Sequence, residues 1–285
     1  MPFKKNPFVP NQKNPFKVSR SKIDLFLECS RCFYLEQRLG VGRPSIPSFT
    51  LNNAVDHLLK KEFDLHRAKE TAHPLMKSFG VDAVPFQNEM MDEWRHNFTG
   101  VQYLDKETNL LIFGAVDDIW KNNKTGELHV VDYKATSKDK EVKELEDTRW
   151  HNQYRRQMEV YQWLLRKNNF EVSDTGYFVY VNGQRDREAF DAKLEFDVNI
   201  IPYTGNADWI DEVLPKIKNC LVSEKIPKSG QGCEYCEYRE SAGKAFKDSV
   251  MNLKIDNEEK KEDGEKKTKI KKESKANSGQ TLFQG

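Results

Sequence analysis

The sequence predicts an α/β protein in which helices flank a small mixed β-sheet. Apolar residues recur at helical spacing through residues 21–69, and two β-prone stretches then follow between residues 109 and 135. A further helical stretch and two more strands come next along the chain. With 37% hydrophobic residues over 285 positions, the chain can bury one core of this kind.

Two helices are predicted before the first strands. One covers residues 21–39, where Ser21 and Asp24 have the spacing of a capping box. The second covers residues 51–69, with apolar side chains every three or four positions. A third, shorter helix is predicted over residues 87–97.

The period then changes to that of strands. Residues 109–120 and 127–135 are apolar and β-prone, and the turn-forming sequence KNNKTG separates them, so they predict a β-hairpin. The remaining predicted elements are a helix over 150–167, strands over 175–181 and 189–198, and a helix over 208–221.

Composition and charge patterning set the domain organisation. No run of 18 apolar residues exists and the first residues lack an apolar signal core, so we expect a cytoplasmic protein without a membrane partner. We expect an extended segment over residues 1–17, one folded domain over 18–250, and a disordered charged tail over 251–285. The net charge is only +1, so any attraction for a polyanion has to be local.

The predicted hairpin carries the candidate chemistry. Asp132 and Lys134 are two positions apart, so both side chains point to one face of their strand. A four-residue turn over 123–126 would place Asp117 directly opposite Asp132, with Cβ atoms about 5 Å apart. A bulge at Gly126 would shift this pairing by one residue.

Two adjacent carboxylates repel each other unless a cation lies between them. Oxygen ligands of this kind suit Mg²⁺ or Mn²⁺, which can generate a nucleophilic water and polarise a phosphoryl oxygen. Lys134 would orient that water or offset the charge that develops. The pattern favours phosphodiester hydrolysis; the alternative is an ordinary solvated strand end.

These residues resemble the motifs of the PD-(D/E)xK nuclease superfamily, and of its RecB-like and CRISPR-adaptation exonuclease branch in particular. The N-terminal helix with Cys29 is similar to the same region of that branch. The resemblance implies a restriction-endonuclease-like core over residues 18–250. The motifs that carry it are Gly114 with Asp117, then Asp132-Tyr133-Lys134, then Gln157 with Tyr161.

The resemblance also implies roles for single residues. His57, Asp117 and Asp132 would ligate the metal together with the backbone carbonyl of Tyr133, and Lys134 would be the catalytic lysine. Gln157 and Tyr161 would contact the active site or the DNA backbone. Independently of the resemblance, local positive charge makes Arg155 and Arg156 candidates for binding DNA phosphates, with an ordinary solvated charged face as the alternative. Two positions depart from the family pattern, namely Asp118, where a basic residue is common, and Ser30, where proline is usual.

Two CxxC pairs, Cys29 with Cys32 and Cys233 with Cys236, predict a second metal centre. Four thiolates form a complete ligand set that would join the N- and C-terminal segments. Both Zn²⁺ and a [4Fe–4S] cluster accept such a set. The resemblance favours the cluster, although that family usually has three cysteines in its C-terminal group.

The sequence therefore predicts a metal-dependent DNA nuclease in repair, recombination or processing. Two alternatives remain: a catalytically inactive nucleic-acid-binding or scaffold module of the same fold, and a metal-dependent nucleotide phosphohydrolase. The C-terminal residues 280–283, QTLF, are similar to sliding-clamp-binding peptides, so a clamp is a candidate partner.

Overall fold

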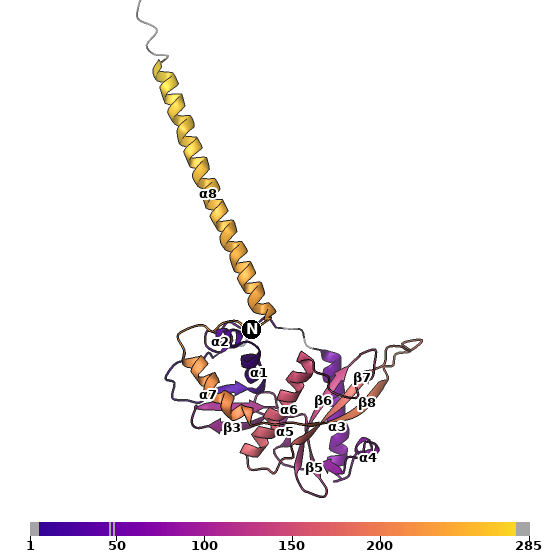
Figure 1. Cartoon of the computed structure of the whole chain (residues 1–285). Helices are drawn as coiled ribbons and strands as arrows, with labels where there is room; N and C mark the ends of the chain where they lie inside the picture. Colours follow the sequence, from indigo (N-terminus) through magenta and orange to yellow (C-terminus); the bar gives the residue numbers. More distant parts are fainter. Residues whose placement is uncertain (1–5, 46, 48, 278–285) are drawn as a thin grey trace, which may run out of the picture. The chain divides into compact units, whose positions relative to one another are not determined.

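The computed structural model describes residues 6–45, 47 and 49–277 (Figure 1). The chain divides into two compact units, residues 1–230 and 231–285. Within the described part of the chain, no helix is long and apolar enough to cross a membrane.

The elements of the first unit are β1 (Phe16–Ser19), α1 (Arg20–Glu28), α2 (Ser30–Gln37), α3 (Thr50–Arg67), α4 (Pro74–Ser78), β2 (Ala83–Pro85), α5 (Met91–Trp94), β3 (Val101–Asp105), β4 (Leu110–Gly114), β5 (Asp118–Asn122), β6 (Leu128–Thr136), α6 (Arg149–Lys167), β7 (Thr175–Gly183), β8 (Phe196–Thr204) and α7 (Trp209–Val222).

A five-stranded mixed sheet, in the order β2-β5-β6-β7-β8, forms the centre of this unit. Strand β6 pairs antiparallel with β5 and parallel with β7. The predicted register of the β5–β6 hairpin is confirmed, because Asp118 lies opposite Val131 and the Asn122 N–H donates to the Glu127 carbonyl at 2.9 Å. The ladder ends at Asp118, so Asp117 is the first residue beyond it.

A second mixed sheet has three strands in the order β1-β4-β3. The prediction of one strand over residues 109–120 is therefore wrong, because β4 ends at Gly114 and β5 of the other sheet begins at Asp118. Between them the Val116 N–H donates to the Trp94 carbonyl at 3.1 Å. A continuous apolar run gives no signal for such a change of sheet, because both strands are buried.

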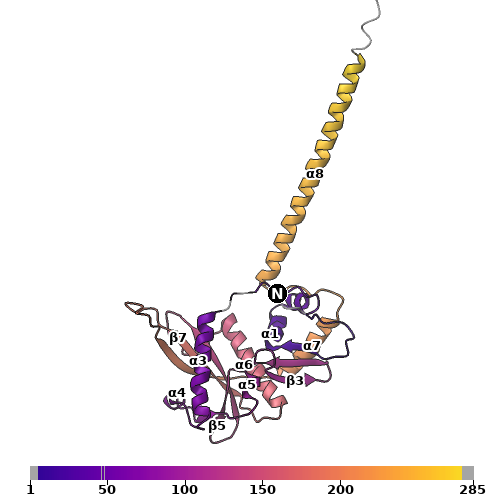
Figure 2. The same ribbon diagram turned by 180° about the vertical axis from the view of Figure 1, so that it is seen from behind.

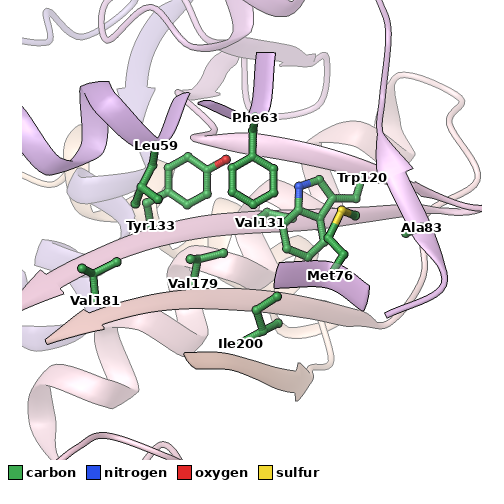
Figure 3. Close-up of a cluster of buried hydrophobic side chains, with 10 residues drawn as sticks. All are labelled: Leu59, Phe63, Met76, Ala83, Trp120, Val131, Tyr133, Val179, Val181 and Ile200. Atoms are coloured by element: carbon green, nitrogen blue, oxygen red, sulfur yellow. The ribbon is translucent and has the colours of Figure 1, made fainter. Parts of the chain in front are cut away.

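Helix α3 packs across one face of the five-stranded sheet and is seen most clearly in Figure 2. Its side chains Leu59 and Phe63 meet Val131 and Tyr133 of β6 in a buried cluster (Figure 3). Because side chains alternate along a strand, Asp132 and Lys134 point to the opposite face of β6, towards α6. The apolar core thus fixes the direction in which the polar residues point.

The predicted helix over residues 21–39 is two helices, α1 and α2. The chain breaks at Cys29, which is extended with φ −159° and ψ 98°. The Sγ atom of Cys29 accepts the backbone N–H of Cys32 at 3.4 Å and so caps α2. The thiol replaces the usual hydroxyl or carboxylate cap, which is why the capping pattern in the sequence did not reveal the break.

Two other predicted elements differ in extent. The predicted helix over residues 87–97 is reduced to the single turn α5. The predicted strand over 189–198 is displaced, because Asp191 and Ala192 adopt positive φ of 43° and 56° and form a turn. Strand β8 begins only at Phe196, opposite Gly183 of β7.

The second unit contains the helix α8 (Glu234–Asn277), which includes most of the segment predicted to be disordered. Glu and Lys dominate its sequence, and both residues have high helix propensity. The same segment has few large apolar residues, which is the property on which the prediction of disorder rested. The candidate clamp-binding peptide at 280–283 lies outside the described residues.

Candidate active site

The two predicted carboxylates meet where the β5–β6 hairpin opens. The backbone N–H of Tyr133 donates to Oδ2 of Asp117 at 3.0 Å, which fixes that carboxylate beside β6. The Arg95 side chain donates to the Asp117 carbonyl at 2.9 Å and holds the backbone there. Asp117 is thus positioned by its own hairpin, although it lies outside the strand ladder.

Asp132 is fully buried, in the middle of β6. Its Oδ1 accepts the Gln157 Nε2–H at 2.7 Å, and its Oδ2 forms an ion pair with the Lys134 ammonium. Burial raises the pKa of Asp132 to about 6, with a contribution from the neighbouring charge of Asp117 and in opposition to Lys134. Both oxygens of Asp132 are therefore engaged, one by an amide and the other by a cation.

Lys134 lies on the same face of β6 as Asp132, as the two-residue spacing predicted. Its ammonium contacts Asp132, lies 3.4 Å from Gln157 Oε1, and stands 4.6 Å from the ring centroid of Tyr154. Burial acts to lower the pKa of Lys134, but the charges of Asp132 and Asp117 outweigh it and raise the pKa. The side chain is therefore cationic at neutral pH.

Helix α6 supplies the other wall of the site. Gln157 and Tyr161 are one turn apart, and the Gln157 amide donates to both Asp132 and the Tyr161 hydroxyl, the latter at 3.1 Å. Tyr161 in turn packs on Gly114, where an added Cβ would lie 2.6 Å from the Tyr161 ring. The glycine of the motif is needed for this close approach of strand and ring.

Asp117 has a further partner that the sequence did not reveal. Its Oδ1 accepts from the Lys60 ammonium of α3 at 3.0 Å, and the same ammonium lies 2.9 Å from Asp56 Oδ2. Burial acts to raise the pKa of Asp117, but Lys60 and Lys134 and the Tyr133 N–H outweigh it and lower the pKa. Lys60 and Asp117 are 57 positions apart, so no local pattern could have shown the contact.

His57, the predicted metal ligand on α3, has an exposed side chain. Among the described residues, its ring is not part of any group of three ligands close enough together to hold a metal ion. Its neighbour Asp56, one position earlier, is the α3 residue that shares a cation with Asp117.

The predicted DNA-binding arginines at the start of α6 bind other parts of the chain. Arg155 donates to Asn152 at 2.5 Å and to the Leu145 carbonyl at 2.6 Å. Arg156 pairs with Asp24 of α1 at 2.5 Å, and burial nevertheless raises the pKa of that carboxyl. Both arginines therefore fasten neighbouring segments onto the helix that carries Gln157.

A buried charge network supports the hairpin from the α3 side. Asp118 is fully buried and forms ion pairs with Arg67 of α3 and with Arg95, the latter at 3.2 Å. It also accepts the Tyr133 hydroxyl at 2.7 Å. The acidic residue that departs from the family pattern is thus a structural anchor next to Asp117.

The four predicted metal-binding cysteines are all buried. Cys29 and Cys32 belong to the first unit and Cys233 and Cys236 to the second, and the two pairs together are a candidate ligand set for a metal ion. In the first unit, Cys29 Sγ also accepts the Gly230 N–H at 3.2 Å, and such a bond stabilises a thiolate. Cys220, by contrast, has a pKa raised by burial to about 11, as expected for a thiol without a ligand role.

Comparison with known families agrees with this geometry. The family model of the PD-(D/E)XK nuclease superfamily matches residues 17–241, which include the hairpin, α3, α6 and all four of these cysteines. The chain belongs to this superfamily. Comparison with curated proteins gives no match. Membership indicates a nuclease that hydrolyses phosphodiester bonds and uses divalent metal ions, and it agrees with the observed mixed α/β fold.

Proposed function

We propose that the protein is a Mg²⁺- or Mn²⁺-dependent DNA nuclease of the RecB-like branch that acts in DNA repair, recombination or processing. The observation that carries the proposal is the convergence of Asp117, Asp132, Lys134 and Gln157 at the open end of the β5–β6 hairpin. Three elements contribute to it, and each side chain has a defined contact that fixes its direction.

The residues fit a hard divalent cation. Asp132 Oδ2 is a buried carboxylate oxygen whose partner is already a cation, the Lys134 ammonium, and the Tyr133 N–H holds Asp117 beside the same strand. These two carboxylates and the Tyr133 carbonyl would hold the ion. When bound, it would supply Lewis acidity and a water of lowered pKa.

The protein residues would position and neutralise the reacting groups. Gln157 fixes the rotamer of Asp132, and the Tyr133 N–H fixes that of Asp117. Lys134 remains protonated beside them, so it can stabilise negative charge on the phosphoryl oxygens.

The substrate is tested by incubating labelled single-stranded DNA, duplex DNA and nucleoside triphosphates with Mg²⁺ or Mn²⁺. We expect cleavage of DNA by the wild type and a loss of at least a hundredfold in Asp132→Ala and Lys134→Ala. Hydrolysis of the nucleotides alone would indicate the phosphohydrolase instead. No cleavage of any substrate, or equal rates in all three proteins, would contradict the nuclease and favour an inactive binding module.

We further propose that Cys29, Cys32, Cys233 and Cys236 bind a [4Fe–4S] cluster, with Zn²⁺ as the alternative. The buried thiols and the N–H groups directed at Cys29 Sγ support a bound thiolate centre. Anaerobically purified protein should absorb broadly near ~400 nm and contain iron and sulfide. One equivalent of zinc without that absorbance would contradict the cluster and support the alternative.

A further inference from the structure

Helix α3 brings a second lysine and a third carboxylate to the site. The Lys60 ammonium lies 2.9 Å from Asp56 Oδ2 and 3.0 Å from Asp117 Oδ1. All three side chains are part-buried, with 21%, 34% and 22% of the Lys60, Asp56 and Asp117 side chains exposed. The contacts are therefore shielded from bulk water, yet solvent ions can reach them.

The helical period explains why Asp56, and not His57, belongs to this group. Asp56 and Lys60 are four positions apart and share one face of α3, whereas His57 is turned by about 100°. His57 is exposed, as is Lys61 four positions further on. The side chain next to the proposed metal site is thus the carboxylate.

Lys60 occupies the oxygen that a metal would need. Of the two oxygens of Asp117, Oδ2 accepts the Tyr133 N–H and Oδ1 accepts the Lys60 ammonium. A cation that binds Oδ1 must therefore displace the ammonium. Among the described residues, the carboxylates are not close enough together to form a metal-binding group, and an ammonium lies between two of them.

The charges of the site also indicate that a bound divalent cation displaces a lysine. Asp56, Asp117 and Asp132 carry three negative charges when ionised, and Lys60 and Lys134 carry two positive charges. A divalent ion added to this set would leave a net positive charge in a shielded site unless one lysine withdraws. The Lys134 side chain packs on the Tyr154 ring and is 15% exposed, whereas the Lys60 side chain is 21% exposed, so Lys60 has the more open path to solvent.

We propose that Asp56 is the ligand that α3 supplies to the divalent cation, and that Lys60 is a built-in competitor which holds Asp56 and Asp117 until the cation displaces it. This inference rests on the proposed nuclease function. It assigns to Asp56 the role that the family resemblance gave to His57. It also predicts that the removal of Lys60 strengthens metal binding.

The test is a Mn²⁺ titration of the full chain at pH 7.5, with binding followed by the electron paramagnetic resonance signal of the free ion. We expect Asp56→Asn to weaken binding by about tenfold to a hundredfold, as for other residues that support a metal site. The matched control His57→Asn should stay within about twofold of wild type. Lys60→Met, which keeps an unbranched side chain only one atom shorter and removes the charge, should bind Mn²⁺ more tightly.

Asp132→Asn separates failure of this inference from failure of the proposed function. If Asp132→Asn abolishes Mn²⁺ binding but Asp56→Asn does not weaken it, only the role of Asp56 is wrong. The same holds if His57→Asn is the variant that loses Mn²⁺ binding. Weaker binding by Lys60→Met would contradict the competition. If the wild type binds no Mn²⁺, or Asp132→Asn binds as the wild type does, the nuclease site itself is wrong. Circular dichroism melts of each variant show whether a loss of Mn²⁺ affinity comes from unfolding. A gain of Mn²⁺ affinity in Lys60→Met cannot come from unfolding.

Discussion

Asp132 combines complete burial with a raised pKa because it lies in the middle of β6, under α6. Folding raises this pKa from 3.8 to about 6, so the folded protein without metal binds a proton more tightly than the unfolded chain. The free energy of unfolding should therefore fall as the pH rises from about 4 to about 6.

The affinity for Mn²⁺ should rise with pH, whereas the free energy of unfolding of the metal-free protein should fall. The ion needs the carboxylate form, so binding should strengthen between pH 5 and pH 7.5 as the competing proton leaves Asp132. Parallel titrations at the two pH values, with melts of the metal-free protein, check both signs. An affinity that does not change over this range would show that Asp132 is not a ligand.

Gly114 is the residue whose role is purely steric. An added Cβ would lie 2.6 Å from Tyr161 Cε1, and the ring cannot retreat without disturbing its contact with Gln157. We expect Gly114→Ala to lower the free energy of unfolding by about 1–3 kcal/mol, as other overpacked sites do. Urea denaturation measures the change, and Gly243→Ala, where nothing lies within 4 Å of the added Cβ, is the control.

At the scale of elements, the attachment of α3 to the hairpin depends on the buried ion pair between Arg67 and Asp118. Truncation of Arg67 would leave the fully buried Asp118 carboxylate with one charged partner among the described residues, Arg95. We expect Arg67→Ala to cost about 3 kcal/mol of unfolding free energy, because the loss of one partner from a buried pair is strongly destabilising.

The matched control is Arg185→Ala. Arg185 pairs with Asp139 at the surface, where both side chains are more than half exposed, so its loss should change stability by at most about 1 kcal/mol. Chemical denaturation of the two variants provides the comparison. Similar losses in both would show that the buried network does not anchor α3.

The elements also show what local sequence patterns can predict. The hairpin register was predictable because a turn signal of fixed length and the period of two determine pairing. The break at Cys29 was not predictable, since a thiol caps the second helix. Lys60 and Asp56 were missed because their contact with Asp117 joins segments that only the packing of α3 on the sheet brings together.

At the scale of the whole molecule, the near-neutral net charge is the sum of segments with different charge patterns. The site concentrates carboxylates beside lysines, whereas the segment after residue 250 mixes Lys and Glu with few apolar residues. We propose that the folded nuclease domain ends near residue 250. A chain that ends there should have a melting temperature within about 2 °C of the full chain, since few buried side chains are removed.

Thermal melts of the two chains test this domain boundary. A large drop in the melting temperature of the shorter chain would show that residues 251–285 contribute to the folded domain. The helical signal lost on truncation, measured by circular dichroism, would show how much of α8 beyond residue 250 is helical in solution.

The central claim is that Asp117 and Asp132 hold a divalent cation that cleaves phosphodiester bonds. Its most direct test is the initial rate of DNA cleavage as a function of Mn²⁺ for the wild type, Asp117→Asn, Asp132→Asn and the control Asp92→Asn, a change at an exposed residue of α5. We predict a saturable Mn²⁺ dependence in the wild type and in Asp92→Asn, and rates lower by at least about a hundredfold in the two site variants. Cleavage that continues without a divalent ion, or that survives both site substitutions, would contradict the claim.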